Sequence, residues 1–237
     1  PLNEQLAMNV NYSKQDLEDR LDKLIKESNH WHDQLVISDT LAVEFPLSKD
    51  QTLEKVSLYS PFYNETLLNA TKVKQALLSL PLSYMGYSGY LNPFTLESQI
   101  NGKMPPISQI TTSFHEAAHQ LGYANEKEAN FIAYLSAIKN NDPYIKYAGY
   151  TFAFRYLYYE FYKIDPLGAR GKLKLLNSGI KKNFREVSDF WEKYENPFEI
   201  IFDKTYDTYL KANGQKSGIK SYNEMVGLVI NYHKNER

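Results

Sequence analysis

Apolar residues recur at helical spacing through most of the chain. The first stripe follows Ser13, which with an acid three positions later has the spacing of a capping box, and the stripe consists of Leu17, Leu21, Leu24 and Ile25. We therefore expect a helix from Ser13 to about His30. Beyond residue 125 the same spacing predicts helices over residues 126–139, 144–164, 166–176, 179–194, 197–211 and 221–233. The helix over 144–164 is apolar on every side, which predicts that it is buried.

A different pattern lies ahead of these later helices. Between residues 84 and 100, aromatic residues alternate with glycine and serine and show no helical period, which predicts strands or a hairpin. Short helices are expected over 50–60 and 70–80, whereas 35–45 fits either short strands or irregular chain. The expected fold class is α+β, predominantly α, in one domain over residues 1–237 with a small sheet or hairpin.

The charge and the cysteine content exclude several kinds of function and of metal site. The chain has 237 residues, with 27 basic and 28 acidic side chains and a net charge of -1, so it has no overall basic bias toward nucleic acid. It contains no cysteine, which excludes disulfides, thiol catalysis and cysteine-ligated zinc. A metal ion must then be held by histidine and carboxylate. The sequence has no run of about 18 apolar residues that could cross a membrane.

The sequence H-E-x-x-H at residues 115–119 is the strongest chemical signal. On a helix, residues four apart share a face, so His115 and His119 can direct two imidazole nitrogens at one point. Glu116 lies about 100° around the helix from His115. Its carboxylate can there take a proton from a metal-bound water.

The helix that carries this motif has start and stop signals of its own. Thr111, Thr112 and Ser113 offer N-cap hydroxyls, and Gly122 suits the left-handed residue that ends a helix. The two histidines are therefore expected to lie in a helix that begins near Thr111 and ends near Gly122.

A second helix after a short turn can complete a metal site. Glu126, Ala129 and Asn130 stand at i, i+3 and i+4 and share one face. If this helix folds back on the first, Glu126 becomes the third ligand, and Asn130 lies one turn along, where it can orient a ligand histidine. Two histidines and one glutamate leave one position open, as in catalytic zinc sites. Asn125 and Glu128 are rival third ligands, although an amide oxygen is a poorer zinc ligand than a carboxylate.

A simpler interpretation stands beside the metal site. His115 and His119 can be histidines on a helix surface, and Glu126 and Glu128 can be ordinary acids of a first helical turn, where they favour the helix dipole.

Two further features could bear on function. His30 and His32 stand at i and i+2 and cannot converge from one helix face, so we interpret them as surface histidines. The strand or hairpin at 84–100 is a candidate for receiving a substrate backbone by strand addition, or it only covers the core.

With residues 115–122 and 126–134, the chain resembles a bacterial family known as domain of unknown function 3810. Its members look like zincin-type metallopeptidases and typically carry membrane-spanning helices before the soluble domain. Phe114 stands where members often have cysteine. The resemblance covers nearly the whole chain, and residues 1–6, 92–97, 147–150 and 209–222 also match the pattern of the family.

The wider zincin group adds to this resemblance. In its glutamate-ligand branch the third ligand opens the pattern E-x-x-A-[DN], which Glu126, Ala129 and Asn130 match. The loop between His119 and Glu126 is shorter than is usual in that branch. The resemblance implies a membrane-tethered, zincin-like domain with zinc held by His115, His119 and Glu126, and with Glu116 as general base.

We therefore expect a zinc metallopeptidase that acts on peptide or protein substrates. It would be anchored in a membrane by an N-terminal segment ahead of this sequence, with the domain on the extracytoplasmic side. The alternatives are a non-catalytic, membrane-anchored binding or regulatory module and a zinc amidase acting on cell-wall amides. A metal helix covered by residues 222–233 would favour the module. Side chains with the chemistry of an oxyanion donor, which the sequence cannot place near the metal, are Tyr147, Tyr150, Arg155 and His233.

Overall fold

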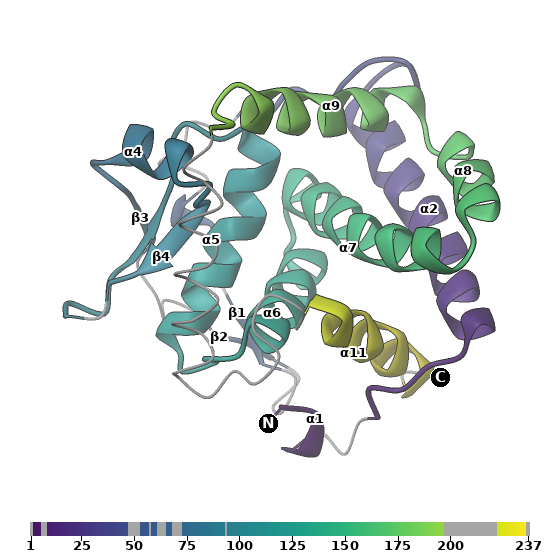
Figure 1. Cartoon of the computed structure of the whole chain (residues 1–237), viewed down its shortest axis with the longest axis horizontal. Helices are drawn as coiled ribbons and strands as arrows, with labels where there is room; N and C mark the ends of the chain where they lie inside the picture. Colours follow the sequence, from purple (N-terminus) through teal and green to yellow (C-terminus); the bar gives the residue numbers. More distant parts are fainter. Residues whose placement is uncertain are drawn as a thin grey trace.

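The computed structural model describes residues 2–5, 9–46, 53–56, 58–60, 65–67, 73–92, 94–196 and 222–235. The helices are α1 (Leu2–Gln5), α2 (Lys14–Leu35), α4 (Ser79–Tyr84), α5 (Pro106–Gln120), α6 (Glu126–Lys139), α7 (Pro143–Ile164), α8 (Pro166–Lys174), α9 (Ser178–Glu192) and α11 (Tyr222–Asn235). The strands are β1 (Leu58–Ser60), β2 (Glu65–Leu67), β3 (Val73–Gln75), β4 (Gly89–Leu91) and β5 (Ser98–Ile100). The fold is predominantly helical with a small sheet, which confirms the predicted α+β class (Figure 1).

The small sheet has three strands in the order β3-β5-β4. Strand β4 runs antiparallel to β5, and β3 runs parallel to β5. The β4–β5 pair confirms the hairpin predicted over residues 84–100, although its first residues belong to α4 and a turn. A separate two-stranded sheet pairs β1 with β2.

The prediction of short helices over residues 50–60 and 70–80 is wrong for most of the residues that the structure describes there. Strands β1 and β3 lie in these ranges, and α4 begins only at Ser79. Leu58 and Val73 are buried, so pairing with β2 and β5 and packing against the helices outweigh a weak local preference for helix.

Helix α2 begins as predicted and ends later. Ser13 is its N-cap: the Ser13 hydroxyl accepts from the Asp16 backbone N–H at 3.1 Å, and the Asp16 carboxylate accepts from the Ser13 N–H at 2.9 Å. This is the predicted capping box. The helix continues past His30 to Leu35, and residues 36–46 contain no strand.

The prediction that His30 and His32 are surface histidines is correct for His30 and wrong for His32. His30 is exposed, but His32 is fully buried. Its Nε2–H donates to the Leu41 carbonyl at 2.9 Å, and its Nδ1 accepts from the Asn177 amide at 3.1 Å. His32 continues the buried stripe of α2 one turn beyond Ser28, so its position on the helix places it in the core.

Helix α7 lies in the core, but it is not buried on every side as predicted. Tyr159 and Ile164 are exposed, whereas Glu160 and Phe161 in the same turns are buried, so one side of the last turns of α7 faces solvent. Its buried residues include Tyr147, Ala148, Phe154, Leu157 and Phe161.

Helix α5 lies between the small sheet and the helical body of the fold. Figure 1 shows it between the small sheet on one side and α7 on the other, and it also packs against α6. Helix α11, which includes residues 222–233, packs on α6, α7 and α2. Residues next to α5 therefore come from both the sheet and the helical body.

In the part of the chain that the structure describes, no helix is long and apolar enough to cross a membrane. The helix predicted over 197–211 lies outside the described residues.

Candidate metal centre

Helix α5 begins five residues earlier than predicted. Its first residue is Pro106, which suits this position because the first N–H groups of a helix have no partner within the helix. The predicted N-cap hydroxyls are inside the helix. Thr111 and Ser113 hydrogen-bond back to the carbonyls of Ser108 and Gln109 at 3.3 and 2.6 Å. The early start places the histidines in the last turns of α5.

The turn after α5 sends the chain back alongside it. Gly122 has φ 96°, the left-handed conformation predicted for it. Asn125 is the N-cap of α6, where its side chain accepts from the Lys127 N–H at 3.2 Å. The first turn of α6 therefore lies beside the last turns of α5.

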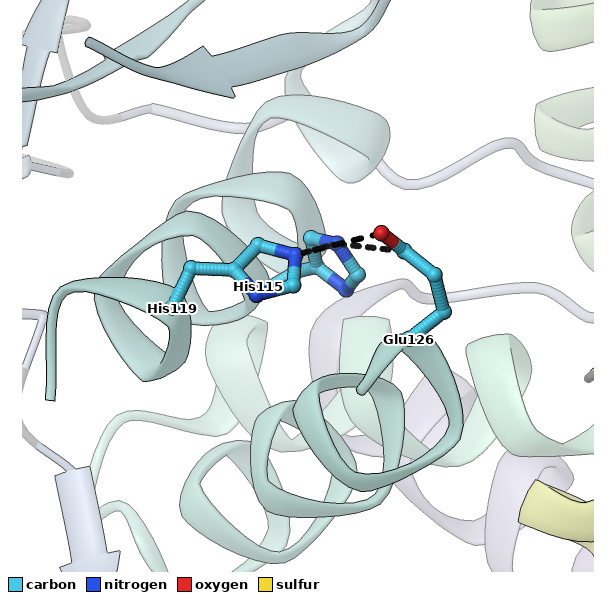
Figure 2. Close-up of side chains that lie close together, drawn as sticks. All are labelled: His115, His119 and Glu126. Atoms are coloured by element: carbon cyan, nitrogen blue, oxygen red, sulfur yellow. Dashed lines mark hydrogen bonds and ion pairs between the residues drawn. The ribbon is translucent and has the colours of Figure 1, made fainter. Parts of the chain in front are cut away.

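Three side chains meet across this α5–α6 pair, as Figure 2 shows. His115 and His119 extend from α5 and Glu126 extends from α6. The two Nε2 atoms are 3.0 Å apart, and the Glu126 carboxylate lies 3.2 Å from His115 Nε2 and 3.5 Å from His119 Nε2. The structure thus brings together the three residues that the sequence predicts as metal ligands.

Both imidazole rings are fixed from their far side. His115 Nδ1 lies 2.9 Å from the Asn130 side-chain oxygen, and His119 Nδ1 lies 2.8 Å from the Tyr123 carbonyl oxygen. Both oxygens can only accept, so each Nδ1 carries a proton and donates it. In the neutral rings the lone pairs are then on the two Nε2 atoms, which face each other and Glu126.

This arrangement of donor atoms fits a metal ion. Two lone pairs and a carboxylate at such short distances repel one another unless a proton or a cation lies among them. Tetrahedral zinc bonds of about 2.0–2.2 Å separate two ligand atoms by about 3.3–3.5 Å. The three observed distances, 3.0, 3.2 and 3.5 Å, are within a few tenths of an ångström of that requirement.

The charged side chains of the site shift one another's pKa values. Burial alone lowers the pKa of His115, but its hydrogen bond to Glu126 and the negative charges of Glu126 and Glu116 outweigh burial and raise that pKa to about 9. Burial raises the pKa of Glu126, but its hydrogen bonds to His115 and His119 outweigh this and lower it. The site therefore favours a positive charge next to Glu126.

Glu116 has a different environment from the three converging residues. Its side chain is almost fully buried, with 4% exposed, and its Oε2 has no hydrogen-bond partner among the described residues. Burial raises its pKa, and the nearby His115 and His119 partly offset this rise. The backbone of Glu116 is fixed as well, because the Ser98 hydroxyl donates to the Glu116 carbonyl at 2.7 Å.

Strand β4 approaches Glu116 closely at Gly89. A Cβ atom at Gly89 would lie 2.6 Å from Glu116 Oε1 and 2.8 Å from its Cγ, which is closer than real Cβ contacts come. Glycine is therefore required at this position of the sheet for Glu116 to occupy its place.

The rival third ligands have other partners. Asn125 caps α6, and the Glu128 carboxylate accepts from the Leu2 N–H at 2.6 Å. The Glu128 carboxylate does not belong to the group of converging ligand atoms.

The oxyanion candidates are engaged outside the metal centre. Tyr150 packs half-buried against the hydrophobic core. The other three have polar or aromatic partners: the Tyr147 hydroxyl donates to Asn183 at 2.9 Å, the Arg155 guanidinium lies over the Phe184 ring, and His233 Nε2 lies 2.8 Å from the Tyr134 hydroxyl.

A family described as "Protein of unknown function (DUF3810)" matches residues 1–230. The chain belongs to this family. No curated protein and no solved structure matches it. In this DUF3810 protein, helices α5 and α6 and strands β3 to β5 all lie within the matched residues.

Two contacts in the centre of this DUF3810 protein have no signal in the sequence. The Tyr123 carbonyl that holds His119 is a backbone group, so no residue type marks it. Gly89 is one of eleven glycines, and only its position in the sheet relates it to Glu116. The Asn130 contact, in contrast, was expected from its spacing to Glu126.

Proposed function

We propose that this protein is a zinc-dependent peptidase with a zincin-like centre. The observation that carries the proposal is the convergence of His115 Nε2, His119 Nε2 and the Glu126 carboxylate beside the buried carboxylate of Glu116. Structural zinc sites are usually closed by four protein ligands, whereas three ligands leave a position for a reacting molecule. A neighbouring carboxylate that is not itself a ligand is the group that a hydrolytic reaction needs.

Each residue has a defined role in the proposal. His115 and His119 hold the metal through Nε2, and Glu126 holds it through its carboxylate. Asn130 and the Tyr123 carbonyl accept the Nδ1 protons and keep both lone pairs directed inward. Zinc, when bound, supplies a Lewis acid that polarises a carbonyl group and lowers the pKa of a water to about 7.

Glu116 is the general base in this proposal. Burial raises the pKa of its carboxyl above the ordinary value of a glutamate, which makes its carboxylate a better proton acceptor. Oε2 takes the proton of the attacking water and then delivers it to the leaving nitrogen. Gly89 and the Ser98 hydrogen bond keep the residue in place from the sheet side.

The proposed substrate is an extended polypeptide. Strand β4 is at the edge of its sheet and pairs with β5 alone among the described strands. Because Gly89 of β4 lies against Glu116, a peptide that added to β4 as a further strand would pass close to the base. Strand addition supplies main-chain hydrogen bonds whatever the side chains of the peptide.

The resemblance to membrane-tethered zincins supports the proposed location. We propose that the centre belongs to a membrane-anchored protein and lies on the extracytoplasmic side. The lack of cysteine is compatible with an oxidising compartment.

The test measures metal content and hydrolysis in the same preparations. Zinc is quantified by mass spectrometry, and cleavage is followed on a degenerate peptide library with the new termini identified. Wild type is expected to hold near-stoichiometric zinc and to cleave. Glu116→Gln should keep the zinc and lose cleavage by about 100-fold or more, since it removes only the base. Glu126→Ala should lose the zinc.

Glu128→Gln is the matched control. It is the same chemical change in the first turn of α6, and an oxygen remains to accept the Leu2 N–H, so zinc and cleavage should both persist. Full cleavage by Glu116→Gln would contradict the mechanism. A wild type that takes up no zinc after dialysis against it would favour the non-catalytic module. Hydrolysis of cell-wall amides without cleavage of peptides would favour the amidase.

A further inference from the structure

The outer face of α8 combines exposed apolar and basic side chains. Leu167 is 78% exposed, and Ile164 and Leu175, at the two ends of α8, are 52% and 59% exposed. On the same helix Arg170 and Lys174 are exposed. Leu167, Arg170 and Lys174 are three and seven residues apart in sequence, so they share one face of the helix.

The acidic side chains near α8 pair with lysines outside its exposed face, and Glu160 of α7 pairs with Lys163 at 2.6 Å. Lys172, on the opposite side of α8, pairs with Glu18 at 3.0 Å and with Asp22 at 2.7 Å, both in α2. Asp165 accepts from Lys14 at 3.1 Å. Within the described part of the chain, no carboxylate pairs with Arg170 or Lys174. The outer face of α8 therefore carries positive charge that these acids do not neutralise.

The last turns of α7 extend the surface with an aromatic residue. Tyr159 is 61% exposed, and the Lys163 ammonium lies 4.5 Å from the centre of its ring. Tyrosine and lysine side chains have an apolar body and a polar tip, and they are enriched where proteins meet the interface of a membrane. We call this surface the α7–α8 corner, and it consists of Tyr159, Lys163, Ile164, Leu167, Arg170, Lys174 and Leu175.

The α7–α8 corner lies at the edge of the molecule. Figure 1 shows α8 at the rim of the molecule, where it turns away from the end of α7. A rim of two helices can insert exposed side chains into a soft surface, whereas a groove is needed to enclose a peptide.

A second exposed apolar cluster provides a comparison. It lies at α4, where Leu77, Leu78 and Leu80 are exposed. Residues 76–102 around it contain no lysine or arginine, whereas residues 163–174 contain four. In the α7–α8 corner, Arg170 and Lys174 thus lie on the same helix as the exposed Leu167.

We infer that the α7–α8 corner is a docking surface for a membrane rich in anionic lipids. Ile164, Leu167 and Leu175 would enter the boundary between headgroups and acyl chains, and Arg170 and Lys174 would lie at the level of the phosphates. Tyr159 and Lys163 would lie at the edge of this contact. The inference is independent of the proposed peptidase activity, because no residue of the corner belongs to the metal centre.

The test is co-sedimentation of the purified chain with vesicles. One set contains phosphatidylglycerol mixed with phosphatidylcholine, and the other contains phosphatidylcholine alone. The wild type is expected to prefer the anionic vesicles and to lose this preference at high salt. The variant Arg170→Gln/Lys174→Gln should bind them about 25-fold more weakly, since each cation near the surface contributes about fivefold. Leu167→Gln should weaken binding about tenfold.

The matched control is Lys182→Gln/Arg185→Gln, which removes the same charge from exposed positions of α9. It should bind like the wild type, and circular dichroism should show that all variants are folded. The inference is overturned if the wild type does not prefer anionic vesicles, or if the control loses as much binding as the α8 variant. Concentration-dependent self-association that Leu167→Gln abolishes, without vesicle binding, would also overturn it and assign the corner to a second copy of the chain.

Discussion

The Nε2 atoms of His115 and His119 lie 3.0 Å apart, a few tenths of an ångström closer than two imidazole ligands of a tetrahedral zinc ion. Both rings are held in this position by acceptors behind them, Asn130 and the Tyr123 carbonyl. A metal ion therefore needs only a small outward movement of the rings to enter. Most of the ordering that a metal site requires is already present in the fold.

Metal addition should raise thermal stability. A ligand that binds the folded state at 100 times its Kd stabilises it by about 2.7 kcal/mol, which for a chain of this size raises Tm by about 5–10 °C. Differential scanning calorimetry with zinc and after chelation measures the shift. His119→Ala should abolish it, and an equal shift in that variant would place the bound metal elsewhere.

Replacing Asn130 should weaken metal binding without removing a ligand. Asn130→Leu removes the acceptor of the His115 Nδ1 proton, and loss of such a partner typically lowers metal affinity 10–100-fold. Asn130→Asp is the control, because its carboxylate can still accept that proton. Competition with a chromogenic chelator measures both affinities. Equal affinities in the wild type and Asn130→Leu would show that His115 is oriented by other contacts.

Gly89→Ala should displace the base and spare the metal. The added Cβ would meet Glu116 Oε1 at 2.6 Å and the Gln99 carbonyl oxygen at 2.9 Å, so Glu116 must move. A displacement of this order can reduce catalysis about 100-fold. Cleavage rate and zinc content are the measurements. Gly171→Ala, where nothing lies within 4 Å of the added Cβ, should leave both unchanged.

Gly179→Ala should destabilise the fold away from the metal. Its Cβ would lie 1.9 Å from the Leu41 carbonyl oxygen and 2.4 Å from His32 Nε2, so it would break the hydrogen bond between these two groups. We expect a loss of about 2 kcal/mol or more in the free energy of unfolding, measured with urea. A stability equal to that of Gly171→Ala would mean that residues 36–46 can move aside at little cost.

The sequence predicts best those structural features that depend on a few neighbouring residues. The capping box of Ser13 and Asp16 and the left-handed Gly122 depend on the chemistry of one turn, and both are present. The convergence of His115, His119 and Glu126 depends on helical spacing and one short loop.

Predictions failed where a distant segment decides the outcome. His32 is buried because Leu41 and Asn177 provide partners that its own helix cannot reveal. Strand β3 forms because β5, more than twenty residues later, pairs with it. The start of α5 was misplaced because the hydroxyls of Thr111 to Ser113 suit an N-cap, whereas the helix begins at Pro106, a residue that suits the first helical position.

All three converging side chains come from residues 115–126, a single helix–turn–helix. A metal ion there closes only a short loop of chain, and the entropy removed by closing a loop grows with its length. Helices α7 and α11 pack against this unit, and none of the three converging side chains comes from them. A metal ion bound there would add little to the folding of the domain, so the domain could acquire or exchange that ion after it has folded.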